Sequence, residues 1–223
     1  MTRPLRLVVY DRTDTAPVVV PRVVRRPDGS VEGTGGLTPF WKLGGVYHRA
    51  LLRADGVLGA ASWSEALGWA VGLAEARGAP IGELQAWGHG GWGYMRMGES
   101  RLDAASFDGA GAPLAEQMDA FCKHLAPRAL LWLRCCSAFG HVEGRAFARA
   151  LADRTGARVA GHTHVIGFFQ SGTHSVGPGE EPAWSEREGT LYGEGDRATG
   201  ADTSRATAPR TLTALRPGLP DGW

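Results

Sequence analysis

The sequence predicts an α/β fold of three layers, in which helices lie on both sides of a central, mostly parallel sheet. Short apolar runs such as residues 129–133 show no alternation of polar and apolar side chains, which is typical of strands buried on both faces. These runs alternate with segments of helical spacing, a pattern that favours right-handed crossovers and parallel strands. The chain has 223 residues, 43% of them apolar, which is enough for one large domain.

The first quarter of the chain predicts two strands, a turn and a loop. Residues 5–10 (Leu-Arg-Leu-Val-Val-Tyr) form the first strand, and residues 18–24 form a second run in which Pro21 suits an edge strand. Residues 27–30 (Pro-Asp-Gly-Ser) are typical of a turn. Residues 33–45 are rich in glycine, and we expect a structured loop there.

The next part predicts a helix, a strand and a second helix. Ser62 and Glu65 have the spacing of a capping box, and Gly78 with Pro80 ends the helix that they begin. Residues 81–87 then form a strand, and residues 88–91 (Gly-His-Gly-Gly) form a flexible turn after it. A helix with Pro113 in its first turn buries an apolar stripe that comprises Leu114, Met118, Phe121, Cys122 and Leu125.

The third part repeats this order and ends in a tail. Residues 129–137 form the strand that stops at Cys135 and Cys136, residues 142–155 form a helix, and residues 158–160 form another strand. From residue 193 onward, Gly, Ala, Thr, Pro and Arg dominate and core formers are sparse. We therefore expect a domain over residues 1–192 and a partly ordered tail over residues 193–223.

Composition and charge exclude several classes of function. The net charge of +1 gives no electrostatic case for binding nucleic acid or an anionic membrane. No apolar run is long enough to span a bilayer, and the N-terminus lacks the cleavage site of a signal peptide. We therefore expect a cytoplasmic protein whose three cysteines are reduced thiols.

Chemically reactive side chains follow three strands at the point where each strand ends. They are His89, the pair Cys135 and Cys136, and the pair His162 and His164. Parallel strands share one carboxyl edge, so these side chains are expected to open on one crevice, where α/β proteins bind ligands. A cysteine beside a histidine and a helix N-terminus should have a depressed pKa and act as a nucleophile. Backbone N–H groups of Gly90 and Cys136 are candidate oxyanion donors.

The same strand ends resemble the caspase-like superfamily of cysteine peptidases. Trp87-Gly88-His89-Gly90 is similar to its histidine motif, and residues 131–140 (Leu-Trp-Leu-Arg-Cys-Cys-Ser-Ala-Phe-Gly) are similar to its cysteine motif. His89 precedes Cys136 by 47 positions, close to the spacing of about 50 in caspases. The segment through residue 160 more closely resembles a bacterial caspase-like domain of unknown function. The resemblance implies a caspase-like sandwich and a cysteine endopeptidase that acts on a protein or peptide substrate without a cofactor.

The choice between the two cysteines rests on the family pattern, which has a small residue before the nucleophile and often a serine after it. Cys135-Cys136-Ser137 fits if Cys136 is the nucleophile and Cys135 takes the packed position, although counting back from Gly140 also allows Cys135. Successive side chains of a strand point to opposite faces, so Cys135 and Cys136 cannot both face His89 if the strand continues through them.

A catalytically silent module that binds a partner or peptide is the alternative function, and the oligomeric state stays open.

A second histidine group offers another candidate site. His162 and His164 share one face if the strand continues through them, and with His174 they could bind zinc in a metal-dependent hydrolase. No HExxH or paired CxxC motif supports a metal, so we favour pocket-lining roles. We expect residues 170–179 to be an ordered loop in which Gln170 and His174 help to shape substrate binding, together with His162 and His164.

Overall fold

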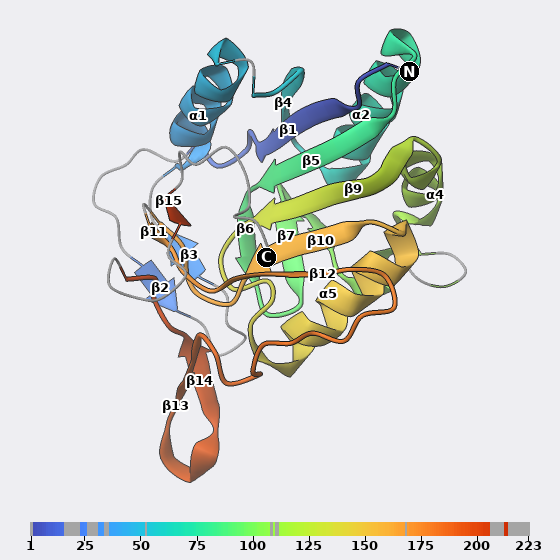
Figure 1. The fold of residues 1–223 in the computed structure, drawn as a ribbon. Coiled ribbons are helices and arrows are strands. Elements are labelled where there is room, and N and C mark those ends of the chain that lie inside the picture. Colours follow the sequence, from blue (N-terminus) through green and yellow to red (C-terminus); the bar gives the residue numbers. More distant parts are fainter. Residues whose placement is uncertain are drawn as a thin grey trace.

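A six-stranded sheet forms the centre of the computed structural model, with the strand order β12-β10-β9-β5-β1-β4 (Figure 1). Its strands are β1 (Leu5–Asp11), β4 (Gly56–Ala60), β5 (Ile81–Trp87), β9 (Leu125–Arg134), β10 (Arg158–His162) and β12 (Thr173–Val176). All neighbours pair in parallel except β12, which is antiparallel to β10. The structure describes residues 2–15, 23–25, 31–33, 36–51, 53–107, 109, 112–167, 169–205 and 212–213.

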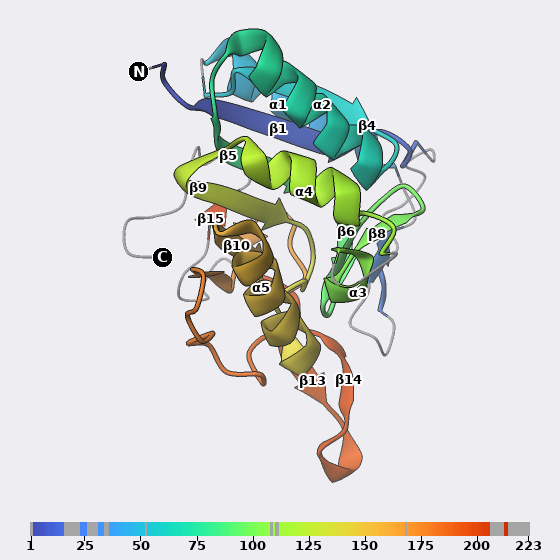
Figure 2. The same ribbon diagram turned by 90° about the vertical axis from the view of Figure 1, so that its right-hand side faces the viewer.

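The helices lie on both faces of this sheet. They are α1 (Thr38–Ala50), α2 (Trp63–Arg77), α3 (Ala104–Phe107), α4 (Ala115–Lys123) and α5 (His141–Thr155). Figure 2 shows α2, α4 and α5 side by side in one layer, and the main core lies between them and the sheet. Helix α1 packs on the opposite face, where Trp41 joins a cluster with Val8, Tyr10 and Trp87. The predicted α/β class and the mostly parallel sheet are confirmed.

The local signals for α2 and α5 are confirmed in detail. The Ser62 side chain accepts a hydrogen bond from the Glu65 N–H at 3.1 Å, so Ser62 is the N-cap of α2. Gly78 ends this helix in the left-handed conformation, and Gly156 ends α5 in the same way. These caps fix the chain direction before β5 and β10, two of the strands that carry site residues at their ends.

Helix α1 corrects the expected loop over residues 33–45. Residues 38–45 of this segment are helical, and the two glycines among them are packing positions: a Cβ on Gly44 would lie 2.6 Å from the Trp87 ring, and one on Gly45 would lie 2.7 Å from Val57. Glycine at both positions lets the helix backbone approach the sheet closely, although it lowers helix propensity. The sequence signal was misleading because glycine in a helix is usually unfavourable.

Two further expectations about loops are corrected. The turn predicted over residues 88–91 contains strand β6 (His89–Gly91), which forms a small sheet with β7 (Tyr94–Met97) and β8 (Ser100–Leu102). The loop predicted over residues 170–179 contains β12 and the end of β11 (Phe169–Gln170), which pairs with β15 (Leu212–Thr213). Both segments therefore have fixed backbone directions next to the carboxyl edge of the main sheet.

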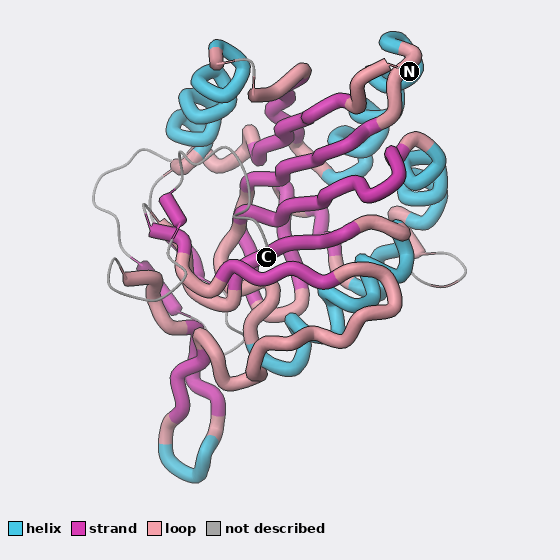
Figure 3. Tube along the Cα trace, in the orientation of Figure 1, coloured by secondary structure: helices cyan, strands magenta, loops and turns pink. Residues whose placement is uncertain are grey.

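The predicted start of the tail falls inside a hairpin. Strand β13 (Thr190–Tyr192) pairs with β14 (Ala198–Ala201), and the short 3-10 helix η1 (Glu194–Asp196) lies between them; Figure 3 shows this hairpin projecting from the body. Val165 pairs with Thr203, and the Val165 N–H donates to the Asp202 carbonyl at 2.7 Å. Residues 198–203 are therefore part of the folded structure, and most of the remaining tail lies outside the described residues.

The N-terminal expectations are covered only in part. Residues 5–10 form β1 as predicted. Of the run over residues 18–24, the structure describes Val23 and Val24, which belong to β2 (Val23–Arg25) and pair with β3 (Val31–Gly33). The turn over residues 27–30 lies outside the described residues. Within the described part of the chain, no helix is both long and apolar enough to cross a membrane.

Candidate active site at the carboxyl edge of the sheet

Neighbouring strands bring the histidine and cysteine motifs to the same level of the sheet. Strands β5 and β9 pair in parallel, with Trp87 opposite Arg134 in the last register pair. His89 lies two positions after Trp87, and Cys136 lies two positions after Arg134. The predicted convergence of the two strand ends is therefore present in the structure.

Glycine 90 is the point at which the two motifs touch. A Cβ on this residue would lie 2.6 Å from the Cys136 carbonyl oxygen and 2.7 Å from the Cys135 Sγ. Any side chain would therefore collide with the cysteine segment, so the contact requires glycine at this position. The backbone of β6 thus lies directly against the loop that carries both cysteines.

His89 lies in a polar, partly open environment. Its side chain is 24% exposed, and its Nε2 lies 2.9 Å from Oδ2 of Asp14. The ring also meets Trp41 of α1 edge to face, with centroids 5.4 Å apart. Within the described residues, no hydrogen bond joins the His89 ring to either cysteine. A carboxylate therefore orients this histidine, while the thiols stand apart from it.

Asp14 is a site residue that the sequence analysis missed. It lies in the segment after β1, the strand next to β5, and its Oδ2 also accepts a hydrogen bond from the Leu37 N–H at 2.8 Å. This second bond fixes the carboxylate between the start of α1 and the His89 ring. The signal that could have found it is the one that found His89, a polar side chain just past the carboxyl end of a central parallel strand.

Cys135 occupies a packed position, as expected for the residue before the nucleophile. Its side chain is 1% exposed and belongs to the main core. Burial raises the pKa of the Cys135 thiol well above its ordinary value. A buried thiol with a raised pKa is typical of a packing residue.

Cys136 faces a different cluster and is partly exposed. It packs against a small group formed by Trp92, Val165 and Ala201, and its Sγ lies 3.7 Å from the Ile166 carbonyl oxygen. The two neighbouring cysteines therefore point into different surroundings. Cys136 is the more accessible thiol of the two.

The depressed pKa expected for the nucleophile is wrong for this arrangement. Burial raises the pKa of the Cys136 thiol to about 11. The expectation assumed a helix N-terminus next to the cysteine, but α5 begins at His141 after its N-cap Gly140. No charged partner of the thiol compensates for its burial among the described residues. The thiol is protonated at neutral pH.

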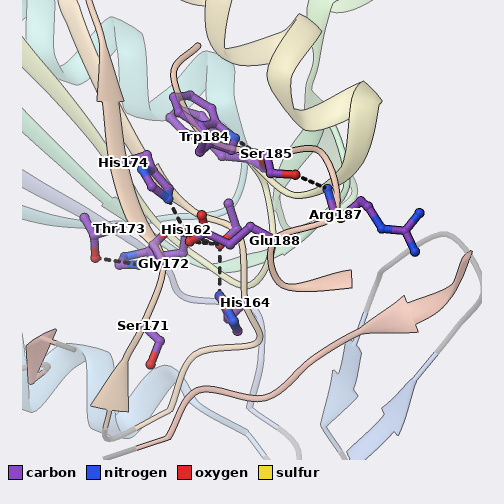
Figure 4. Close-up of polar contacts among 12 residues, drawn as sticks. His162, His164, Ser171, Gly172, Thr173, His174, Trp184, Ser185, Arg187 and Glu188 are labelled. Carbon is purple, nitrogen blue, oxygen red and sulfur yellow. Dashed lines mark hydrogen bonds and ion pairs between the residues drawn. The ribbon is translucent and has the colours of Figure 1, made fainter. Parts of the chain in front are cut away.

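In the histidine group after β10, the Thr163 hydroxyl and the Glu188 carboxylate link His164 to His174 by hydrogen bonds, whereas His162 bonds to Thr173 (Figure 4). His162 is fully buried, its Nδ1 lies 3.1 Å from the Thr173 hydroxyl, and burial lowers its pKa to about 3. The His164 Nδ1 lies 2.9 Å from the Thr163 hydroxyl. These rings are neutral at physiological pH and belong to the wall of the sheet edge.

His174 lies on the other side of this group. Its Nε2 lies 2.8 Å from the Glu188 carboxylate, and its ring stacks on Trp184 with centroids 4.9 Å apart (Figure 4). Because His162 lies opposite Thr173 across β10 and β12, the next residue, His174, faces the opposite side of the sheet. Among the described residues, no three His, Cys, Asp or Glu side chains are grouped as metal ligands. The structure therefore does not bring His162, His164 and His174 together as a zinc site.

Gln170 lies next to a buried arginine on the α1 side of the sheet. Its Oε1 accepts a hydrogen bond from Arg134 at 3.1 Å, and Arg134 also donates to Gln85 at 3.0 Å. The guanidinium lies over the rings of Trp132 and Trp87, at 4.5 and 5.2 Å. Gln170 is thus part of a buried polar network around Arg134, and Arg134 lies two positions before Cys136 in the sequence.

Comparison with known proteins gives one match. A family model described as a domain of unknown function (DUF4347) matches residues 71–174. The matched span includes His89, both candidate cysteines and the three histidines around β10 and β12, and it leaves out Asp14, α1 and the β13–β14 hairpin. No curated protein and no solved structure matches the chain.

Proposed function

We propose that the chain is a caspase-like cysteine endopeptidase that cleaves peptide bonds with Cys136 as nucleophile and His89 as general base and acid. The observation that carries this proposal is the contact at Gly90, by which the histidine segment of β6 lies against the cysteine loop. It is supported by the parallel pairing of β5 with β9, whose ends deliver both residues to one edge. The caspase-like form of the sandwich is part of the proposal.

The protonated thiol decides how the first step proceeds. A thiol with a pKa of about 11 is not a preformed thiolate, so His89 removes its proton as Sγ attacks the carbonyl carbon of the substrate. Asp14 holds the ring through Nε2 and stabilises the imidazolium, which leaves Nδ1 to receive the proton. No hydrogen bond joins the two side chains among the described residues, and we expect it to form when substrate binds, as is common for catalytic hydrogen bonds.

The remaining steps return the enzyme to its starting state. The tetrahedral oxyanion is stabilised by the backbone N–H groups of Gly90 and Cys136. The C–N bond then breaks, and the His89 imidazolium protonates the leaving amine to leave an acyl thioester on Cys136. Water, deprotonated by His89, hydrolyses the thioester and releases the carboxylate product. No step requires an added cofactor.

The experiment that tests this function compares the two cysteines on a mixture of denatured proteins as substrate, with new N-termini read by mass spectrometry. The wild-type chain and Cys135→Ala should produce the same cleavages, whereas Cys136→Ala should lose them by a factor of about 10³ or more. Iodoacetamide should abolish cleavage and chelators should leave it unchanged. Activity that chelation removes and zinc restores would contradict the proposal in favour of a metal-dependent hydrolase.

A catalytically silent module that binds a protein or peptide is the second candidate. The raised pKa of Cys136 and the separation of both thiols from the His89 ring favour it. It predicts that the wild-type chain produces no new N-termini under any of these conditions, while a peptide still binds at the sheet edge. Whether the wild-type chain produces new N-termini that Cys136→Ala does not therefore separates the two candidates.

A further inference from the structure

Helix α1 carries a group of apolar side chains that face solvent. They are Leu37, Phe40, Leu43, Val46, Tyr47 and Leu51, with exposed fractions between 38% and 68%. Elsewhere in the described residues, Val142 is the one further large apolar side chain with comparable exposure. Single exposed apolar residues are ordinary, but a group of six on one element marks an interaction surface.

The spacing of these residues indicates the shape of what covers them. Phe40, Leu43 and Tyr47 lie at positions i, i+3 and i+7 of α1, so they form a stripe along one side of the helix. Leu51 continues the stripe just beyond the last turn. A stripe of this kind is the seam that a second helix packs against.

The inner side of α1 is already occupied by the sheet. Gly44 and Gly45 lie against Trp87 and Val57, and the side chain of His48, which also belongs to α1, is buried. The apolar stripe therefore cannot turn inward without breaking these contacts. It is available to a partner while α1 stays in place.

The charged side chains that α1 itself carries are basic. Helix α1 contains no acidic residue, and the exposed Lys42 and Arg49, seven positions apart, lie along one edge of the apolar face, next to Val46. A partner that pairs with Lys42 and Arg49 presents acidic side chains beside its own apolar seam.

We infer that the outer face of α1 docks a partner protein through an amphipathic helix with acidic flanks. A second copy of this chain is disfavoured because it would bring Lys42 and Arg49 of two helices together without acidic partners. An anionic membrane is disfavoured because the two cations Lys42 and Arg49 are fewer than the roughly four to eight that mark lipid-binding clusters. The docking does not depend on the peptidase activity proposed above.

The position of α1 links this surface to the candidate active site. Trp41, on the inner side of the helix, meets the His89 ring, and the Leu37 N–H at the start of the helix bonds the Asp14 carboxylate. A partner that shifts or steadies α1 therefore acts on His89 through two direct contacts. The surface is suited to regulation of the site by a bound protein.

The test uses the full chain and a fluorescent peptide of about four helical turns, with Leu on one face and Glu on both flanks. The control peptide has Lys in place of Glu. Fluorescence anisotropy should show binding of the acidic peptide only, weakened about tenfold or more in Leu43→Glu. The matched variant Val142→Glu, which changes an apolar residue of comparable exposure on α5, should bind as the wild type does. Phe40→Ser should weaken binding independently of any effect of Leu43→Glu on folding.

Several outcomes overturn the inference. They are absence of binding by the acidic peptide, equal binding of both peptides, or equal loss in Leu43→Glu and Val142→Glu. A dimer that light scattering detects in the wild type and not in Leu43→Glu would assign the surface to a second copy. Cosedimentation with phosphatidylserine–phosphatidylcholine vesicles that depends on Leu43, without peptide binding, would assign it to a membrane. Melting temperatures close to that of the wild type confirm that the variants fold.

Discussion

The two residues of the candidate dyad, His89 and Cys136, follow the ends of neighbouring strands, but one lies in polar and the other in apolar surroundings. The His89 ring is partly open to solvent, held by the Asp14 carboxylate and flanked by Trp41. The Cys136 thiol lies among Trp92, Val165 and Ala201, where its pKa is raised to about 11. The strand topology decides where both residues lie, whereas the loops around them decide whether they are ready to react. In the mechanism proposed above, the histidine is ready for proton transfer and the thiol depends on it for its activation.

The largest effect on the histidine side is expected from removal of the base. His89→Ala should lower peptide cleavage on the order of 10²-fold or more, because a positioned acid-base group is lost. His124→Ala is a matched control, since His124 is also a partly exposed histidine paired with a carboxylate, that of Glu75. Cleavage rates and melting curves check both variants. The contrast between the two histidines is contradicted if His89→Ala keeps the wild-type cleavage rate, or if the control variant loses as much activity as His89→Ala.

Asp14 should act as a positioning residue with a smaller effect. Asp14→Asn removes the charge that stabilises the imidazolium while it keeps the shape of the side chain, so cleavage should fall roughly 10- to 100-fold. Because Asp14 orients the base rather than the substrate, the loss should appear in kcat with little change in KM. Asp196→Asn, which breaks the exposed ion pair with Arg187, is the control and should leave kcat unchanged. A loss confined to KM would show that Asp14 contacts the substrate instead.

The cysteine side predicts a steep dependence of labelling on pH. The thiolate is the reactive form, so below a pKa of about 11 the labelling of Cys136 by iodoacetamide should rise about tenfold per pH unit. Cys135, which is buried in the core, should be labelled more slowly at every pH. Peptide mapping of the alkylated chain measures both rates. Rapid labelling of Cys136 near pH 6 would mean that His89 holds a preformed thiolate, and the contrast between the two sides would then disappear.

Sequence patterns predicted the elements that carry their own local signals. Ser62 and Gly78 predicted the ends of α2, and the apolar runs predicted β5 and β9. These two strands are neighbours in the sheet, so their ends bring His89 and Cys136 to one edge. Helix α1 was missed because Gly44 and Gly45 lower helix propensity while they permit the close packing that fixes the helix. Strand β12 was missed because its Thr-His-Ser-Val sequence lacks an apolar run.

The environment of the site was harder to predict than its position. The pKa of Cys136 depends on Val165, Ala198 and Ala201, which approach from distant parts of the chain. Asp14 reaches His89 across 75 positions of sequence and is fixed by the start of a helix that was not expected. Contacts of this range leave no local pattern, so reactivity could not be derived from the same signals that gave the strand ends.

The smallest expected effect tests whether the hairpin strand β14 sets the state of the thiol. Ala201 is 1% exposed and packs in the same cluster as Cys136, so Ala201→Gln should displace β14 and admit water to the thiol. Better hydration favours the thiolate, so the labelling of Cys136 at pH 8 should increase several-fold. Thr199→Gln places the same neutral side chain on an exposed position of the same strand and should leave the labelling rate unchanged. The labelling of Cys122 reports any general loosening of the fold. If Ala201→Gln accelerates Cys122 and Cys136 alike, β14 supports the fold as a whole; if it accelerates Cys136 alone, β14 controls the difference between the two sides of the site.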